Sequence, residues 1–482
     1  MTDVVHPDNR EMAVRAIKSI GLDVGGVDFL TDDITQSYKD IGGAIVEVNA
    51  APGFRMHVAP SEGKPRDVAA AVMDMLFPPG TPSQIPIAGI TGTNGKTTTS
   101  RMLSHILKTS GHIVGMTSTD GVYIDGHLTV KGDMTGPVSA QMVLRDPSVD
   151  IAVMEVARGG MLRTGVGFRN CDVAACLNVS GDHLGLSGIE TVEQLARVKR
   201  ILIEIATDTA VLNADDNLCL EMANHTKAEN ICYITLADNH PLVREHIRAE
   251  GRAVVLEKGL NGDMITMYDK GSHIPLLWTH LIPATLEGKA VHNVQNAMFA
   301  AALAFSMGKP LDDIRHGLRT FNTTFFQTPG RMNIFDEHPF KVILDYAHNA
   351  AAFKGMCHLV SRLETQGKNI CVISMPGDRR DEDIVEVAKI VSGVFDYFIC
   401  KADDNRRNRG YDEVPQILQK ILLENGVAED NIEVIPDEVE SIQRGLSLAE
   451  PGDLLMVFGD NVTRCWKQII NFNQDGDQKS VV

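Results

Sequence analysis

The stretch Gly89-Ile-Thr-Gly-Thr-Asn-Gly-Lys-Thr-Thr-Thr-Ser100 decides the fold of this chain. An apolar run broken by one proline, residues 85–90, precedes it, and residues 101–107 follow it with apolar side chains at helical spacing. A strand, a glycine-rich turn and a helix that opens on a lysine and a hydroxyl together cradle nucleotide phosphates. A plain Walker A pattern would have a glycine at Ile90. The place between strand and helix nevertheless predicts a nucleotide site rather than a solvated glycine-rich turn.

Each residue type in this loop has a predicted task. Glycines at 89, 92 and 95 let backbone N–H groups approach phosphate oxygens without an obstructing Cβ. The Lys96 ammonium can reach the β- and γ-phosphates, and the Thr97 hydroxyl can bind Mg²⁺. The predicted nucleotide-binding residues of the loop are Gly92, Thr93, Asn94, Gly95, Lys96, Thr97 and Thr98.

Two further polar residues follow predicted strands and are candidate metal ligands. Glu155 ends the apolar run 151–155, and His183 closes the stretch Asn178-Val-Ser-Gly-Asp-His183 just past a second apolar run. The carboxyl ends of parallel strands are where such sheets bind ligands, and Mg²⁺ prefers hard oxygen ligands. A surface glutamate and a loop histidine are the competing interpretations. The shared position after neighbouring strands favours a metal site.

Composition limits the class of protein. Lys and Arg number 45 against 63 Asp and Glu, for a formal charge of −18, which argues against nucleic-acid binding because that needs basic surface. No apolar run approaches the ~20 residues of a membrane span, and no secretory signal is visible at the start. The eight cysteines are scattered and form no CxxC pair, so we expect buried, reduced thiols in a cytoplasmic protein.

A length of 482 residues predicts about three domains. Pro/Gly-rich punctuation at residues 77–83 and a turn signal near residue 328 place them at 1–82, 83–326 and 327–482. In the second and third domains, short apolar strands alternate with helical stretches. This alternation predicts an α/β fold, with a mostly parallel sheet in the central domain and a Rossmann-like C-terminal domain.

The ordered motifs resemble those of the Mur ligase superfamily, and the resemblance covers residues from about 85 to 460. They are Gly92-Thr-Asn-Gly-Lys-Thr-Thr98, Glu155, Asn178-Val-Ser-Gly-Asp-His183, Leu212-Asn-Ala-Asp-Asp216, His292-Asn-Val-Gln-Asn296, Pro329-Gly-Arg331, Asp345-Tyr-Ala-His-Asn349 and Gly377-Asp-Arg379. The stretches 154–163 and 178–185 are closer to the Mur-ligase-like module of the cyanophycin synthetases. The N-terminal domain is unlike the nucleotide-sugar domain of the peptidoglycan enzymes.

Residues 23–29 and 45–57 resemble the end of the ATP-grasp module of the cyanophycin synthetases. The resemblance implies that Asp28, Glu47 and Asn49 match positions that hold the metal ions of ATP. In that family a long N-terminal portion precedes this point and carries the lysines and opposing lobe of the ATP-grasp fold. We therefore expect an ATP-grasp remnant without a site of its own, in a fragment, a truncated product or half of a split enzyme. The expected protein partners are a second copy of the chain or a complementing ATP-grasp chain.

The resemblance implies that ATP and Mg²⁺ serve to activate a carboxylate as an acyl phosphate, which an amine then attacks. In the family's arginine-adding module, the acid is the β-carboxyl of an aspartate at the end of a poly-aspartate backbone, and the amine is the α-amino group of arginine. The implied substrates are therefore arginine and a poly-aspartate or cyanophycin primer. Another Mur-type ligase, of the peptidoglycan-precursor or folylpolyglutamate type, and a non-catalytic polymer-binding remnant are the alternatives.

The resemblance also implies roles for single residues. Lys199 matches a lysine that several Mur ligases carbamylate to gain a metal-binding oxygen anion, although an exposed helix lysine is an equal competitor. Asn296 would lie near the base or ribose of the nucleotide, although a plain helix cap is the alternative. Arg331 and Asp345 would close over ATP from the third domain. The implied catalytic set is Lys96, Glu155, His183, Lys199, Arg331 and Asp345, and the implied substrate-positioning set is Arg158, His348 and Asn349.

Charged runs offer candidates for substrate recognition. The clusters 381–383 and 403–404 contain carboxylates that could bind a guanidinium. Arg158, Arg163 and the run Arg406-Arg-Asn-Arg409 could bind an acidic polymer. A solvated surface is the competing interpretation for each of them.

Overall fold

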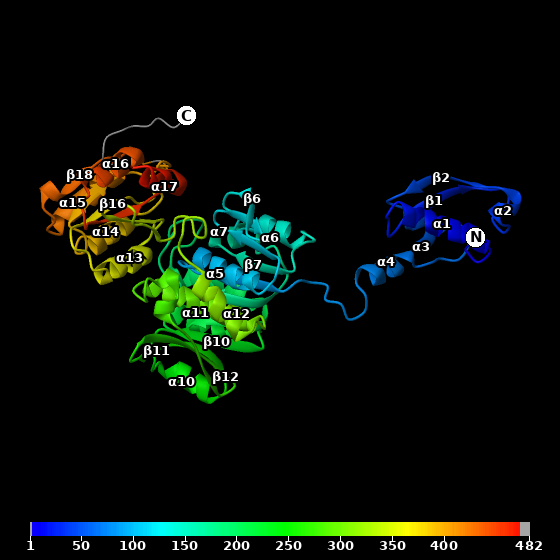
Figure 1. Ribbon diagram of the computed structural model, residues 1–482, viewed down its shortest axis with the longest axis horizontal. Helices are drawn as coiled ribbons and strands as arrows, with labels where there is room; N and C mark the ends of the chain where they lie inside the picture. Colours follow the sequence, from blue (N-terminus) through cyan, green and yellow to red (C-terminus); the bar gives the residue numbers. More distant parts are fainter. Residues whose placement is uncertain (1, 408, 473–482) are drawn as a thin grey trace. The chain divides into compact units, whose positions relative to one another are not determined.

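A computed structural model of the chain describes residues 2–407 and 409–472. The chain divides into two compact units, residues 1–84 and 85–482. The first unit is a small sheet with short helices, and the second contains two sheets with helices on both faces (Figure 1).

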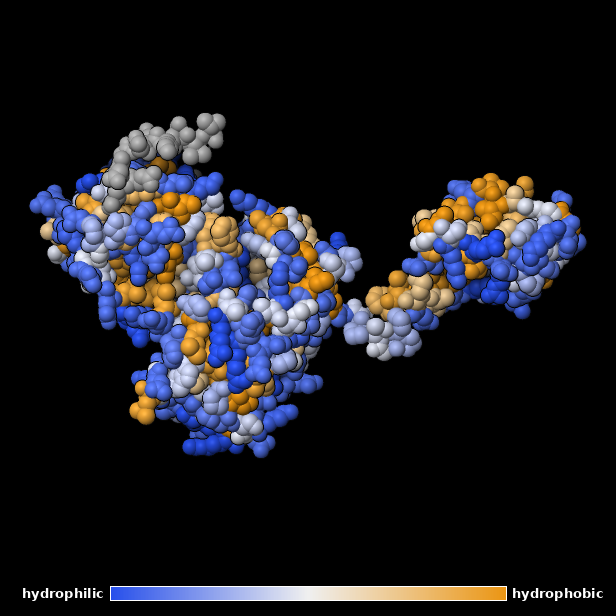
Figure 2. Space-filling view, in the orientation of Figure 1, coloured by the Kyte–Doolittle hydropathy of each residue, from blue (hydrophilic) through white to orange (hydrophobic). Residues whose placement is uncertain are grey.

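The first unit pairs two antiparallel strands. Asp28 of one strand lies opposite Glu47 of the other in this pairing. Among the described residues of this unit, only Asn9 and Ser37 are buried, and no apolar side chain is. Figure 2 shows apolar side chains gathered on the surface of this unit. Its elements are α1 (Pro7–Ser19), β1 (Gly26–Leu30), α2 (Tyr38–Ile41), β2 (Ala44–Asn49), α3 (Arg55–Val58) and α4 (Val68–Leu76). The assignment of this unit to the ATP-grasp fold stays a prediction.

The second unit begins with an eleven-stranded sheet in the order β13-β12-β11-β10-β9-β8-β3-β7-β4-β5-β6. The strands from β11 to β4 in this order are parallel, and antiparallel strands extend the sheet at both ends. The predicted mostly parallel sheet is confirmed. The strands are β3 (Ile87–Thr91), β4 (Val114–Ser118), β5 (Gly121–Ile124), β6 (His127–Lys131), β7 (Ile151–Glu155), β8 (Cys171–Cys176), β9 (Ala206–Asn213), β10 (Asn230–Thr235), β11 (Arg252–Gly259), β12 (Gly262–Asp269) and β13 (Ser272–Trp278).

Side chains of the central strands alternate between two cores. In β3, Ile87 packs into one core while Ala88 and Ile90 pack into the other, as the two-residue period of a strand requires. The core with Ile90 is covered by α5 (Lys96–Thr109), α11 (Val291–Ser306) and α12 (Leu311–Thr320). The core with Ile87 is covered by α6 (Pro137–Leu144), α7 (Arg158–Thr164), α8 (Val192–Glu204), α9 (Asn217–Glu221) and α10 (Pro241–Arg248).

A six-stranded sheet follows in the order β14-β15-β19-β16-β17-β18, and only β14 is antiparallel to its neighbour. Its strands are β14 (Asn333–Phe335), β15 (Lys341–Asp345), β16 (Asn369–Ile373), β17 (Tyr397–Cys400), β18 (Ile432–Val434) and β19 (Leu454–Phe458). One face packs on α13 (Ala350–Arg362), α14 (Asp381–Val391) and α15 (Glu413–Glu424), and the other on α16 (Glu438–Leu448) and α17 (Val462–Ile470). The predicted C-terminal α/β arrangement is confirmed.

All eight cysteines are buried and carry free thiols, as predicted. Within residues 2–407 and 409–472, none of the helices has the length and apolar character that a membrane span requires.

Candidate active site

A cavity of about 820 Å³ opens at the carboxyl ends of β3, β7 and β8 in the first sheet and of β15 in the second. Except for Asn349, every residue of the predicted nucleotide-binding, catalytic, metal-binding and substrate-positioning sets lines this cavity. The fold therefore brings together predicted site residues from segments that are distant in the sequence, such as the phosphate loop and β15. Additional lining residues include Thr119, Asp182, His292, Tyr346, Arg379 and Arg407.

The phosphate loop turns sharply between β3 and α5. Gly95 has a φ of +86° and is the N-cap of α5. A Cβ on Gly95 would lie 2.4 Å from Asn296 Oδ1, so a side chain at this position would collide with the base of α11. The Lys96 ammonium curls over the loop and donates to the carbonyls of Gly92 and Thr93 at 3.0 and 2.9 Å. The loop thus carries a positive charge at its centre, as phosphate binding requires.

Glu155 is the buried carboxylate beside this loop. It ends β7 with 1% exposure, and its Oε1 accepts hydrogen bonds from Thr97 Oγ1 at 3.1 Å and Thr119 Oγ1 at 2.8 Å. Burial raises its pKa even though Lys96 and Arg331 nearby favour the ionised form. A buried carboxylate that shares its oxygen with a threonine hydroxyl is a donor set suited to a hard cation. The two predicted magnesium ligands Thr97 and Glu155 are therefore brought together.

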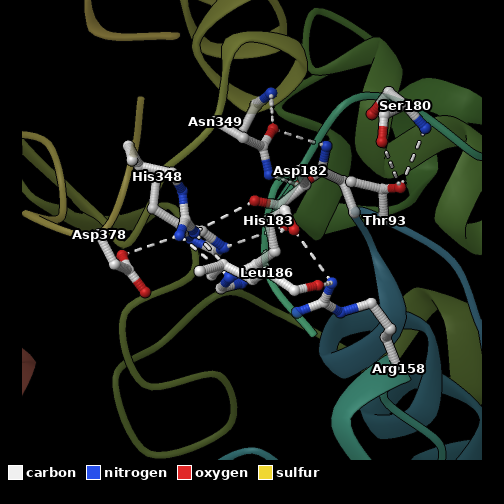
Figure 3. Close-up of polar contacts among 12 residues, drawn as sticks. Thr93, Arg158, Ser180, Asp182, His183, Leu186, His348, Asn349 and Asp378 are labelled. Carbon is white, nitrogen blue, oxygen red and sulfur yellow. Dashed lines mark hydrogen bonds and ion pairs between the residues drawn. The ribbon is translucent and has the colours of Figure 1, made fainter. Parts of the chain in front are cut away.

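His183 has a different set of neighbours (Figure 3). The guanidinium nitrogens of Arg379 lie 3.0 and 3.2 Å from its two ring nitrogens, and Asp182 Oδ2 lies 3.8 Å from Nε2. Burial lowers the pKa of His183 to about 4. Ligand atoms of Asp182, His183 and His348 lie within 4.8 Å of one another. Within the described residues, the ring of His183 makes its polar contacts with Arg379 and Asp182 and not with Glu155 or Thr97.

Lys199 lies beneath the phosphate loop. It is 3% exposed on α8, and its Nζ donates to the carbonyl of Gly92 at 2.7 Å. Burial, together with the nearby charge of Lys96, lowers the pKa of this amine to about 7. The competing interpretation of an exposed helix lysine is wrong, because the helix turns this side chain toward the sheet.

Asn296 lies one helix turn into α11, on the side that faces the phosphate loop. Its Oδ1 accepts from Thr99 Oγ1 at 3.3 Å, and its Nδ2 donates to Asn293 Oδ1 at 3.0 Å. The N-cap of α11 is Ala290, which makes no side-chain cap. The alternative that the asparagines of this segment are plain caps is therefore wrong.

Arg331 and Asp345 line the cavity from the part of the chain that carries the six-stranded sheet. Asp345 ends β15 and accepts from the backbone N–H of Met332 at 2.8 Å. Burial raises its pKa to about 6, while Arg331 opposes this shift. The Arg331 guanidinium lies 5.1 Å from the centre of the Tyr346 ring, which fixes its direction.

Two asparagines connect the parts of the chain that carry the two sheets. Asn94 and Asn349 exchange amide hydrogen bonds of 3.0 and 2.9 Å. Asn349 also caps α13, because its Oδ1 accepts from the N–H of Ala352 at 3.0 Å. Asn349 therefore reaches the phosphate loop itself, although it does not line the cavity within the described part of the chain.

Four of the five carboxylates proposed for a guanidinium ligand already have partners within the chain. Asp381 contacts Arg409 at 2.7 Å, Asp383 contacts Arg380 at 2.7 Å, and Asp404 contacts Arg464 at 2.8 Å. Asp403 accepts from Ser374 Oγ at 2.6 Å.

The arginine candidates for an acidic polymer differ in their environments. Arg158 donates to the carbonyls of His183 and Leu186, whereas Arg406 stacks on Tyr411. Arg158, Arg163 and Arg407 line the cavity.

Family models match two parts of the chain. Residues 90–304 match the Mur ligase middle domain, and residues 330–461 match the domain described as Mur ligase, glutamate ligase domain. The chain is 47% identical to cyanophycin synthetase of Crocosphaera subtropica, over 96% of this chain and 52% of that protein. It is 46% identical to cyanophycin synthetase of Geminocystis herdmanii over the same shares. The chain thus spans about half the length of the curated relatives it matches.

Solved structures share the fold at lower identity. FolC of E. coli in complex with DHPP and ADP has a TM-score of 0.61 at 20% identity, covering 83% of this chain and 91% of that one. A pseudomurein peptide ligase type C from Methanothermus fervidus has a TM-score of 0.57 at 22% identity, covering 83% and 81%. At these identities the likeness shows the fold alone.

Proposed function

Because the chain belongs to the Mur ligase superfamily, we propose that it is an ATP-dependent ligase that joins an amine to a carboxylate through an acyl phosphate. The observation that carries this proposal is the convergence of Lys96, Glu155 and Arg331 on one cavity. A lysine on the phosphate loop, a buried carboxylate and an arginine from the other sheet form the charge pattern that phosphoryl transfer needs.

The reaction would proceed in two steps. A carboxylate oxygen of the acid attacks the γ-phosphorus of ATP, the bond to the β-phosphate oxygen breaks, and ADP leaves. The amine then attacks the carbonyl carbon of the acyl phosphate, inorganic phosphate departs with the oxygen that came from the acid, and the nitrogen loses a proton. Lys96 and Arg331 stabilise the charge that shifts during the first step. If the part of the chain with the six-stranded sheet closes on the part with the eleven-stranded sheet, water would be excluded from the acyl phosphate in the cavity.

Thr97 and Glu155 are the residues that would hold Mg²⁺. Their oxygens lie 3.1 Å apart, and Glu155 is buried with a raised pKa, so a cation beside it would favour its ionised form. A bound Mg²⁺ would neutralise the charge of the β- and γ-phosphate oxygens. His183 could join this ligand set only if Arg379 withdrew from its ring.

Arginine and the β-carboxyl of a poly-aspartate or cyanophycin primer are the proposed substrates. Support comes from the 45–47% identity to cyanophycin synthetases, against 28% identity to the diaminopimelate-adding ligase of Clostridium botulinum. The convergence of Lys96, the buried Glu155 and Asp345 on one cavity favours a catalyst over a polymer-binding remnant.

An oxygen-tracing assay tests the ligase proposal. Protein, ATP, Mg²⁺, arginine and a poly-aspartate peptide labelled with ¹⁸O in its carboxyl groups should release phosphate that contains one ¹⁸O per turnover. Release should require both arginine and peptide. Unlabelled phosphate, released at the same rate when arginine and peptide are withheld, would overturn the proposal.

We also propose that the first unit docks on a polypeptide equivalent to the portion of the cyanophycin synthetases outside the matched half. An 84-residue unit with no buried apolar side chain among its described residues lacks the core that independent folding requires. Leu30, Val46 and Met56 are 69%, 70% and 66% exposed, so they are apolar side chains that a partner could cover.

Co-purification with the separately expressed remainder of the Crocosphaera subtropica relative tests the docking. The wild-type protein should form a complex, and a chain with Leu30→Asp and Val46→Asp should not. Leu260→Asp, at a fully exposed apolar position in the second unit, is the control and should leave the complex intact. Self-association of the chain without that partner, or equal complex formation by all variants, would contradict the docking.

A further inference from the structure

Arg379 reaches from one sheet to the other. It follows β16 of the six-stranded sheet and is 4% exposed. Its Nη2 lies 3.1 Å from Asp182 Oδ1, and its guanidinium contacts the ring of His183. Both contacted residues lie in the loop after β8 of the eleven-stranded sheet. A single side chain thus joins segments 196 residues apart.

The loop that Arg379 contacts is held in an unfavourable backbone conformation. His183 has a φ of +54°, which is disfavoured for any residue with a Cβ. Arg158 Nη1 fixes the carbonyl of His183 at 3.0 Å, while Arg379 contacts its ring. Arg158, from the part of the chain with the eleven-stranded sheet, therefore holds the main chain of His183. Arg379, from the part with the six-stranded sheet, holds its side chain.

Asp182 needs a cation at this position. Burial opposes the ionisation of Asp182, but His348, His183 and Arg379 lower its pKa overall. Its Oδ1 accepts no regular hydrogen bond from any residue in the described ranges, and its contact there is the ion pair with Arg379. Because a buried carboxylate without a partner is strongly disfavoured, removal of Arg379 should loosen this loop.

Arg379 is itself aimed by its neighbours. Asp378 Oδ1 accepts from its Nη1 at 2.9 Å, and the other oxygen of Asp378 pairs with Arg407. Arg409 Nη2 donates to the carbonyl of Arg379 at 2.7 Å. These contacts aim the guanidinium at Asp182 and His183.

The loop after β8 supports the phosphate loop. Asn178 Oδ1 accepts from the backbone N–H groups of Thr93 and Asn94 at 3.1 and 2.8 Å. The N–H of Ser180 donates to Thr93 Oγ1 at 3.0 Å, and Thr93 Oγ1 donates in turn to the carbonyl of Ser180 at 3.2 Å. Displacement of the 178–183 loop would therefore displace the groups that are predicted to contact phosphate.

From these contacts we propose that Arg379 is a positioning residue that holds the loop of Asp182 and His183, and through it the phosphate loop, in the geometry of the reaction. Its effect on catalysis rests on the proposed ligase function, whereas its effect on the loop does not.

Neighbouring arginines allow a matched test by amide hydrogen exchange and kinetics. In the Arg379→Ala variant, the backbone amide hydrogens of residues 179–187 should exchange at least tenfold faster than in the wild type. The kcat should fall roughly 100-fold because the reacting groups are displaced. Arg380→Ala should match the wild type in both readouts, because Arg380 pairs with Asp383 on its own helix and is 46% exposed. Low-millimolar guanidinium should partly restore the protection and kcat of Arg379→Ala, and Arg379→Lys should lie between the two.

The outcomes separate this proposal from the ligase proposal. Unchanged exchange of residues 179–187 in Arg379→Ala would overturn the positioning role whatever the activity. Tighter apparent Mg²⁺ binding by Arg379→Ala without loss of kcat would overturn it too, because Arg379 would then compete with a metal for His183. Faster exchange that guanidinium reverses supports the positioning role even when the wild-type protein forms no amide.

Discussion

Replacement of Lys96 by methionine is expected to lower kcat for amide formation by roughly a thousandfold or more. The Lys96 ammonium is held over the phosphate loop by the carbonyls of Gly92 and Thr93. It is the loop's own cation and is placed to meet the charge that develops on the γ-phosphoryl group. Methionine keeps much of the length and apolar volume of the side chain, so the loss would report charge rather than packing. Steady-state phosphate release and calorimetric ATP binding measure the effect.

Lys108→Met is the matched control for this prediction. Lys108 lies on the same helix, and its Nζ pairs with Asp125 at 3.2 Å, where both side chains are 45% exposed. An exposed pair of this kind contributes little, so this variant should retain the wild-type kcat. A Lys96→Met enzyme within tenfold of the wild type, or an equal loss in Lys108→Met, would show that the loop lysine does not act on phosphate.

The parts of the site that the sequence predicts are those encoded by short, local patterns. The Gly92–Lys96 spacing between a strand and a helix predicts a phosphate loop because the backbone geometry is set within a few residues. Glu155 is predictable because it ends an apolar strand next to a turn. The structure pairs it with Thr97 through a 3.1 Å hydrogen bond, which the strand pattern alone does not specify.

The parts that sequence reasoning missed depend on pairing between distant segments. The motif 377–379 includes Arg379, but nothing local indicates that its guanidinium lies against His183 rather than in solvent. The same limit applies to Asp381 and Asp404, whose intramolecular partners Arg409 and Arg464 lie far along the chain. The antiparallel hairpins at both ends of the large sheet were likewise not predicted, because strand alternation indicates parallel pairing but not sheet edges.

Lys199→Met is expected to lower kcat by roughly a thousandfold while stabilising the fold. The free energy of unfolding should rise because methionine removes a buried ionisable group. The folded-state pKa of Lys199 is lowered from 10.5 to about 7, which corresponds to roughly 5 kcal/mol. This cost is fully present below pH 7, declines as pH rises toward 10.5, and is absent above 10.5. Denaturant titrations in CO₂-free buffer should show the largest gain at low pH, and a pH-independent difference would contradict the lowered pKa.

The loss of kcat is expected because we propose that Lys199 acts as a carbamate. At pH 7 the Lys199 amine would be neutral in about half of the molecules. The neutral amine can attack CO₂, and this reaction forms an N–C bond and releases one proton. The product is an anion next to Gly92 and Lys96, where it would attract a cation held at the phosphates.

Removal of CO₂ should therefore lower the wild-type kcat, and bicarbonate should restore it. The wild-type protein should show a ¹³C carbamate signal from ¹³CO₂, and this signal should be absent in Lys199→Met. Arg200→Met, which removes a neighbouring surface pair with Glu204, should keep both the signal and the activity. Full wild-type activity without CO₂ would leave Lys199 as a buried amine that only supports the loop.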